Sequence, residues 1–204
     1  MDILLTNLLG FLVGLLTSFL TWWILAHWII PKIKFSKDIS KLKTEDDGSG
    51  YMYRIKFINV GRRGLIDMQV VARLLIKGLS IPRNWVTIKI PLEWNGSYKT
   101  EIPKLSAKSN RIIRLFLSSS PDLQVNSYIP EVIRDKARLG KLTLEELLSL
   151  GSRAKLTIWV FGYDEFSGAR KLFKSYEYQA EDIKDGRFGR LEVVGSSTDP
   201  LPDY

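Results

Sequence analysis

The hydrophobic and polar positions of this 204-residue chain divide it into two unlike parts. The 23 residues from 8 to 30 include no Asp, Glu, Lys or Arg. As an α-helix with a rise of about 1.5 Å per residue, this stretch would be about 34 Å long, enough to cross a hydrocarbon layer of about 30 Å. After it, polar and apolar residues are interspersed. The pattern predicts one membrane-spanning helix followed by one water-exposed domain.

We expect residues 1–31 to be a retained transmembrane anchor, with a cleavable signal peptide as the alternative. A signal peptide has a basic start, an apolar core of about 7–15 residues and small residues at its cleavage site. Here Asp2 and no Lys or Arg precedes the apolar stretch, which is longer than such a core. Bulky Ile29 and Ile30 stand before Pro31, where small residues would be needed. These features favour the anchor.

The residues on either side of the helix predict its orientation. Five lysines and one aspartate lie in residues 32–43, whereas no Lys or Arg precedes the helix. Basic loops stay on the cytoplasmic side, so we expect the N-terminus outside and the domain in the cytosol, at the cell inner (plasma) membrane. The absence of cysteine agrees with a reducing compartment.

One face of the predicted helix carries small residues at a spacing of four. Gly10, Gly14 and Ser18 form this face, with Thr17 and Thr21 beside it. Small residues at this spacing let two helices approach closely, and hydroxyl groups can bond across the contact. The face is our candidate for helix–helix packing in a homo-oligomer. The alternative is that such residues are simply common in membrane helices.

Beyond the anchor, apolar and polar residues alternate with the period of β-strands. Residues 51–57 show this alternation, and it is longest in residues 66–76. Further strands are expected at residues 86–92, 111–117, 155–161 and 171–178. The residues expected to face the core from the longest strand are Ile66, Met68, Val70, Ala72, Leu74 and Ile76. The pattern predicts a mainly β domain at residues 51–195, an Ig-like antiparallel β-sandwich preceded by one transmembrane α-helix.

A short helical insertion interrupts the strands at residues 118–151. A helix is expected at residues 130–139, ended by Gly140, and a second begins with the capping-box pattern from Thr143 to Glu146. Residues 32–50 are expected to be a basic juxtamembrane linker and turn, and residues 196–204 a disordered tail.

The order of several short motifs resembles a known family. The motifs are, in chain order, Phe35-Ser36-Lys37, Tyr53-Arg54-Ile55, Asn59, Arg62, Leu74-Leu75, Ser120-Pro121, Leu144-Glu145-Glu146-Leu147, the strand at 155–161, Gly168, Tyr176, Asp182-Ile183 and Gly186-Arg187-Phe188. Together they resemble the cytoplasmic Ig-like domain of inward-rectifier potassium channels, over about residues 32–194. This chain has one apolar helix and lacks the filter sequence Thr-x-Gly-Tyr-Gly of that family.

The resemblance implies a sandwich that assembles beneath the membrane, with a tetramer favoured, and it implies no potassium filter. It also implies contact with anionic lipid head groups at the junction of helix and domain, where Lys32, Lys34 and Lys37 fall. The alternative is that these lysines serve only as a positive-inside signal. Half of the net charge of +8 lies in residues 32–43, and basic residues near an anionic membrane surface gain about 1 kcal/mol each.

The composition argues against several kinds of chemistry. The single histidine, His27, belongs to the membrane segment and the chain has no cysteine, so Ser-His or Cys-His catalysis and Cys/His metal sites are not expected in the domain. No phosphate-binding glycine motif is present. We expect no enzyme, cofactor or metal. Nucleic acid is an unlikely partner because acidic residues are interspersed with the basic ones.

Two functions remain open at this stage. In the first, the cytosolic sandwich self-assembles, senses a ligand or partner and couples it to a membrane helix bundle that is pore-forming or channel-like. In the second, the protein is a membrane-tethered interaction or accessory module without conduction.

Overall fold

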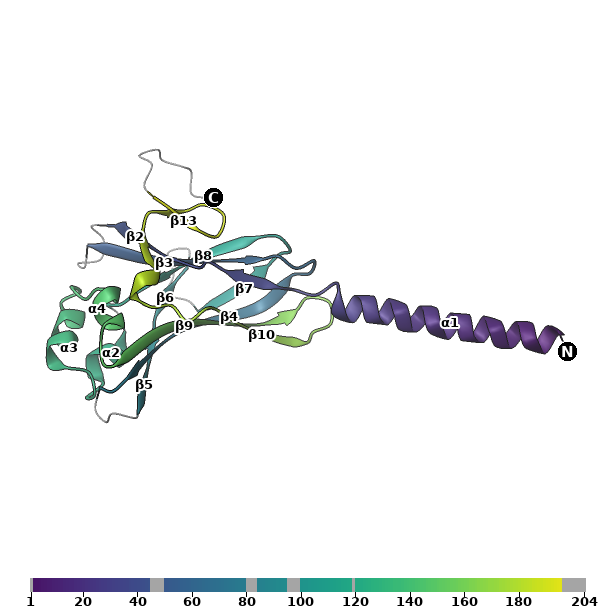
Figure 1. Ribbon diagram of the computed structural model, residues 1–204, viewed down its shortest axis with the longest axis horizontal. Helices are drawn as coiled ribbons and strands as arrows, with labels where there is room; N and C mark the ends of the chain where they lie inside the picture. The colour runs from purple at the N-terminus through teal and green to yellow at the C-terminus, as the bar shows by residue number, and fades with distance from the viewer. Residues whose placement is uncertain (1, 45–49, 80–83, 95–99, 119, 196–204) are drawn as a thin grey trace.

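The computed structural model of the protein describes residues 2–44, 50–79, 84–94, 100–118 and 120–195. Figure 1 shows a β-rich domain with one long helix, α1 (Asp2–His27), projecting from one end. An 18-residue window within Ile3–His27 has a mean hydropathy of 2.1, and none of its residues is buried. A mainly β domain preceded by one apolar helix is therefore confirmed. The predicted turn at 45–49 and the predicted tail at 196–204 lie outside the described residues.

Two sheets form the β-sandwich. The first contains β1 (Ile33–Phe35), β2 (Ile39–Lys43), β3 (Tyr51–Asn59), β6 (Leu92–Glu93), β8 (Asn110–Leu115) and β11 (Ile183–Asp185). In the described residues its order is β11-β2-β3-β8-β6, and β1 pairs with the last residues of β3, next to β2. All these pairs are antiparallel except β11 with β2, which is parallel.

The second sheet is centred on the longest strand. It contains β4 (Leu65–Lys77), β5 (Trp85–Ile90), β7 (Glu101–Leu105), β9 (Arg153–Asp164) and β10 (Arg170–Lys174), in the order β10-β9-β4-β5. β7 pairs with the first part of β4 and β5 with the second, so the two short strands share one edge of β4. A small hairpin of β12 (Arg187–Phe188) and β13 (Val193–Val194) follows.

The inner face of β4 differs from the predicted one at its start. Met68, Val70, Ala72, Leu74 and Ile76 are 0–1% exposed, as their alternation predicts. Ile66 is only partly buried, and Leu65 takes its place in the core. The cause is a β-bulge between residues 66 and 69, with Asp67 at φ 48°, which reverses the alternation over one residue. The prediction for Ile66 was wrong for this reason.

The prediction of a linker at residues 32–50 needs correction. Residues 33–35 and 39–43 are strands β1 and β2, and both pair with β3. In the turn between them Ser36 and Asp38 are buried: the Tyr178 hydroxyl donates to the Ser36 carbonyl at 2.6 Å, and Asp38 forms an ion pair with Lys184 at 2.7 Å. The linker was predicted because lysines are typical of solvent-exposed segments. Here the lysines are interspersed with Ile33, Phe35 and Ile39, which pack on the core.

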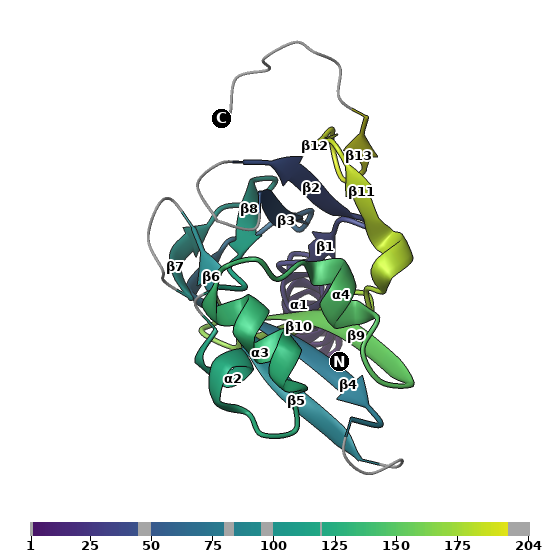
Figure 2. The same cartoon turned by 90° about the vertical axis from the view of Figure 1, so that its left-hand side faces the viewer.

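The insertion forms α2 (Pro121–Val125), α3 (Glu131–Arg138) and α4 (Leu144–Leu148). Figures 1 and 2 show these helices at the end of the sandwich opposite α1. The predicted capping box is confirmed: the Glu146 amide donates to the Thr143 hydroxyl, and the Thr143 amide donates to the Glu146 carboxylate. Leu144 and Leu147 are fully buried, so the insertion closes the core at this end.

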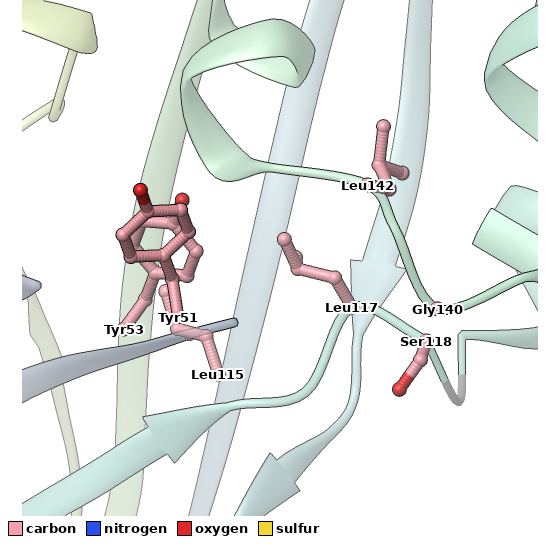
Figure 3. A pocket seen from close by; sticks show the side chains of 7 residues that line it. All are labelled: Tyr51, Tyr53, Leu115, Leu117, Ser118, Gly140 and Leu142. Atoms are coloured by element: carbon pink, nitrogen blue, oxygen red, sulfur yellow. The ribbon is translucent and has the colours of Figure 1, made fainter. Parts of the chain in front are cut away.

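Glu145 fastens the insertion to the first sheet. Its carboxylate accepts a hydrogen bond from the Tyr53 hydroxyl and lies 2.5 Å from Lys41 Nζ. Burial would raise the pKa of Glu145, but the hydrogen bonds from Lys41 and Tyr53 outweigh it and hold the pKa below its usual value. Beside this cluster is a crevice too narrow for water, lined by Tyr51, Tyr53 and residues of the insertion such as Leu142 (Figure 3).

Replacing Leu74 by Ala should lower the free energy of unfolding by about 2–5 kcal/mol, because it removes a fully buried side chain and leaves a cavity. Gln69→Ala, on the exposed face of the same strand, should change it by less than about 0.5 kcal/mol. Urea unfolding followed by circular dichroism measures both. Equal losses would mean that the inner face of β4 is misassigned.

The lowered pKa of Glu145 predicts an acid-dependent stability. Its ionised form is favoured in the folded protein, so its contribution is complete above the ordinary glutamate pKa of about 4.3 and is lost as the pH falls through the lower folded value. The difference in unfolding free energy between wild type and Glu145→Gln should be largest near neutral pH and shrink in acid. Glu181→Gln, at an exposed position, is the control and should show almost no difference at any pH. A constant gap for Glu145→Gln would contradict the assignment.

Candidate membrane-junction site

The chain passes from the apolar helix α1 into the sheet with almost no free backbone. α1 ends at His27, and the Trp28 amide still bonds to the Ile24 carbonyl at 3.0 Å. Pro31 cannot continue the helical hydrogen bonds. Two residues later β1 begins at Ile33. Only residues 28–32 therefore separate the helix from the sandwich.

The buried side chain of Asn59, at the end of β3, binds these residues to the domain. Its Oδ1 accepts from the Lys32 amide at 3.2 Å and from the Gly61 amide at 3.0 Å. Its Nδ2 donates to the carbonyls of Arg63 at 2.7 Å and Ser106 at 3.3 Å. A side-chain amide offers two acceptor positions and two donors, so all four are used. The helix end, the β3–β4 loop and the β7–β8 turn thus meet on one residue.

The β3–β4 loop also packs directly along residues 30–32. The Val60 amide donates to the Lys32 carbonyl at 2.8 Å, and the Arg62 amide donates to the Ile30 carbonyl at 3.3 Å. Gly61 lies between these bonds, and a Cβ atom there would be 2.3 Å from the Ile30 carbonyl oxygen. Only glycine permits so close an approach of the two backbones.

The turn between β9 and β10 completes this end of the domain, and it lies beside the base of α1 in Figure 1. Arg63 is 3.7 Å from the Asp164 carboxylate and 4.2 Å above the Phe166 ring. The Glu165 amide donates to the Gly64 carbonyl at 3.2 Å. Phe166 is 71% exposed although its turn is held in place. The turn thus places an exposed aromatic ring at the end of the domain from which α1 projects.

A cavity of about 300 Å³ opens at the junction, lined by Trp28, Ile30, Lys32, Val60, Gly61 and Arg62. Trp28 is 68% exposed, and Lys32 and Arg62 are exposed as well. In the described part of the chain neither cation forms an ion pair. An amphipathic ring beside two cations matches the interfacial region of a membrane, where aromatic rings and basic groups meet lipid head groups.

The predicted lipid-contact residues are only partly brought together. Lys32 lines the junction cavity, but Lys34 lies on β1 and Lys37 in the turn after it, both exposed. A strand advances about 3.3 Å per residue, so these two lysines lie progressively farther from the cavity. Arg62, which was not among the predicted contacts, joins Lys32 instead. The turn-forming residues from Asn59 to Gly61 predicted this loop, but they did not show that the loop lies against the start of β1.

The predicted packing face of α1 is open in the structure. Gly10 and Gly14 have nothing within 4 Å of an added Cβ, and Ser18 is exposed. The hydroxyl groups beside it bond within the same helix: Thr17 to the Val13 carbonyl at 2.5 Å and Thr21 to the Thr17 carbonyl at 2.8 Å. The face can accept another helix, but these hydroxyls are already engaged. Among the described residues, no three His, Cys, Asp or Glu side chains gather in a way that could hold a metal.

Comparison with known proteins gives little guidance. No protein-family model and no curated protein matches the chain. A solved structure that matches is Spo0M, a sporulation control protein from Bacillus subtilis, with 7% identity and a TM-score of 0.31. The match covers 76% of this chain and 49% of that one, so the chain spans about half the length of Spo0M. A TM-score this low supports no conclusion about fold or function.

Gly61→Ala should loosen the junction, because its methyl group would push the β3–β4 loop away from residues 30–32. We expect faster hydrogen exchange at the Val60 and Arg62 amides and a loss of about 1–3 kcal/mol in stability. Gly195→Ala is the matched control, since nothing lies within 4 Å of a Cβ there. Unchanged exchange at both amides in Gly61→Ala would show that the close contact is absent in solution.

Proposed function

We propose that this protein is a single-pass membrane protein whose cytosolic β-sandwich senses a ligand or partner and passes the change to a bundle of its membrane helices. The observation that supports this most is the junction. Because residues 28–32 are bound to Asn59 and to the β3–β4 loop, a movement of the sandwich is carried to α1 without a flexible linker. A plain anchor has no need of such a connection.

The proposed orientation places the end of the sandwich nearest α1 against the inner membrane surface. Lys32, Lys34 and Lys37 supply basic charge after the helix, and Arg62 adds to it. Phe166 lies on the same end, held by Arg63. Anionic head groups would bind the cations, while the ring of Phe166 enters the interfacial layer.

Self-assembly is proposed from two independent features. Gly10, Gly14 and Ser18 leave an open face on α1, and the resemblance to inward-rectifier cytoplasmic domains favours a tetramer. Since all helices must enter one membrane in the same direction, cyclic symmetry is expected. Such a bundle could act as a pore or as a signal-transmitting anchor.

A second candidate is a membrane-tethered accessory module without conduction. The observation in its favour is the polarity of α1: residues 8–26 have no titratable group, and the hydroxyls of Thr17 and Thr21 bond to their own helix. A bundle of such helices offers an ion few polar partners.

The contact with the membrane can be tested by site-directed spin labelling, because the chain has no natural cysteine. A spin label at Phe166→Cys should be accessible to oxygen and protected from a water-soluble nickel reagent in anionic vesicles. Leu172→Cys, at a 52% exposed position farther along β10, should give the opposite pattern. A fully water-exposed label at 166 would contradict the proposed docking.

Assembly and coupling can be tested together with Gly14→Leu. Mass measurement in mild detergent should give an oligomer for the wild type, and the bulky leucine should loosen the helix bundle. If wild-type vesicles show an ion flux that Gly14→Leu abolishes, the pore form is supported. An oligomer without flux supports the accessory module. A wild-type monomer in detergent and in bilayers would rule out the proposed assembly.

A further inference from the structure

A pocket of about 530 Å³ lies on the outer face of the second sheet, away from the junction cavity. β5 ends at Ile90 and β7 begins at Glu101, and both pair with β4, so its edge has a gap between them. The pocket occupies this gap. Its walls come from β4, the end of β5, the start of α2, and the hairpin of β9 and β10.

Three cations line the pocket from three different strands: Arg73 of β4, Lys89 of β5 and Arg170 of β10. Within the described residues, none of them forms an ion pair. The one carboxylate in the lining, Asp122, accepts a hydrogen bond from the Lys89 backbone amide at 2.9 Å. Arg73 Nε is buried and has no hydrogen-bond partner in the described part of the chain.

Aromatic rings hold two of these cations in place. The Arg170 guanidinium lies 5.4 Å from the centre of the Phe161 ring, and that of Arg73 lies 5.5 Å from the Trp159 ring. The two rings stack at 6.4 Å. Contact with a ring uses the flat face of a guanidinium and leaves its N–H groups free at the edges. The arginines are therefore oriented without being neutralised.

We infer that this pocket binds a small molecule in which phosphate groups are joined to a flat ring, the chemistry of a nucleotide. The N–H groups at the edges of the two guanidinium groups and the ammonium group of Lys89 can donate hydrogen bonds to phosphate oxygens. The Phe161 ring and the apolar residues Ile90 and Pro121 offer surface for the flat part. A volume of this size lies within the range of about 300–1,000 Å³ usual for small-molecule sites.

The β9–β10 hairpin joins this pocket to the membrane junction. It carries Phe161 and Arg170 in the pocket, and its turn carries Asp164 and Phe166, which contact Arg63 at the junction. A ligand that pulls on Arg170 therefore acts on the same short hairpin. The inference that this ligand is the sensed signal rests on the proposed function. The inference that the pocket binds the ligand does not.

The test is isothermal titration calorimetry of the full chain in mild detergent, with ATP as the probe and with adenosine and pyrophosphate as its two parts. ATP should bind more tightly than either part. Arg73→Gln and Arg170→Gln should each weaken ATP binding by about tenfold or more. Lys171→Gln is the matched control, because Lys171 pairs with Gly162 on the other face of the hairpin and its charge lies away from the pocket. It should bind ATP as the wild type does.

Absence of ATP binding would overturn the inference, as would equal weakening by Lys171→Gln. Binding of a single-stranded oligonucleotide that ATP does not displace would also overturn it and would indicate an extended nucleic-acid surface. Arg170 is exposed, so Arg170→Gln should fold normally even if Arg73→Gln does not. If ATP binds but leaves hydrogen exchange at the Val60 and Arg62 amides unchanged, the site stands and the proposed coupling fails.

Discussion

Every hydrogen-bonding position of the Asn59 side chain is used inside the protein, and three separate segments meet on it. Moving one segment away from Asn59 would leave a buried donor or acceptor without a partner, at a cost of about 1–3 kcal/mol for each such group. The three segments are therefore held together. Because one of them carries the apolar helix α1, the same residue determines how that helix leaves the domain. The close contact of Gly61 with the Ile30 backbone depends on this arrangement.

The two ends of the sandwich are closed by different means. At the end far from α1, the leucines of α4 enter the core, and Glu145 ties the insertion to Lys41 and Tyr53. At the other end, backbone hydrogen bonds and the pair of Arg63 with Asp164 hold the loops together. The first end is built for stability. The second leaves Trp28 and Phe166 exposed.

The outer face of the second sheet combines rings and cations in a way that a solvated sheet face does not require. Arg73, Arg170 and Lys174 each lie over a ring of Trp159 or Phe161. Lys155 and Lys174 are neutralised by Glu177, whereas the cations in the pocket have no carboxylate partner in the described residues. The three unpaired cations that gather around one pocket, together with its volume, are the physical basis for assigning a ligand to it.

The sequence alone determined the features that depend on neighbouring residues. The uncharged run of residues 8–30 predicted a helix, because a segment that crosses lipid must satisfy its own backbone hydrogen bonds, and α1 is that helix. The alternation in β4 identified five of its six core positions, and the Thr143–Glu146 box identified the start of α4. Each of these patterns lies within one strand or a few turns of helix.

The tertiary structure decided what depends on residues distant in the chain. The bulge at Asp67 moved Ile66 out of the core, because strand register is set by pairing with β9 as well as by alternation. The lysine-rich segment after the helix became β1 and β2 because the edge of β3 was free to pair with it. The meeting of Lys32 with Arg62, and of Arg73 with Lys89 and Arg170, depends on which strands lie side by side. No local pattern carries that information, since the paired residues are separated by whole strands.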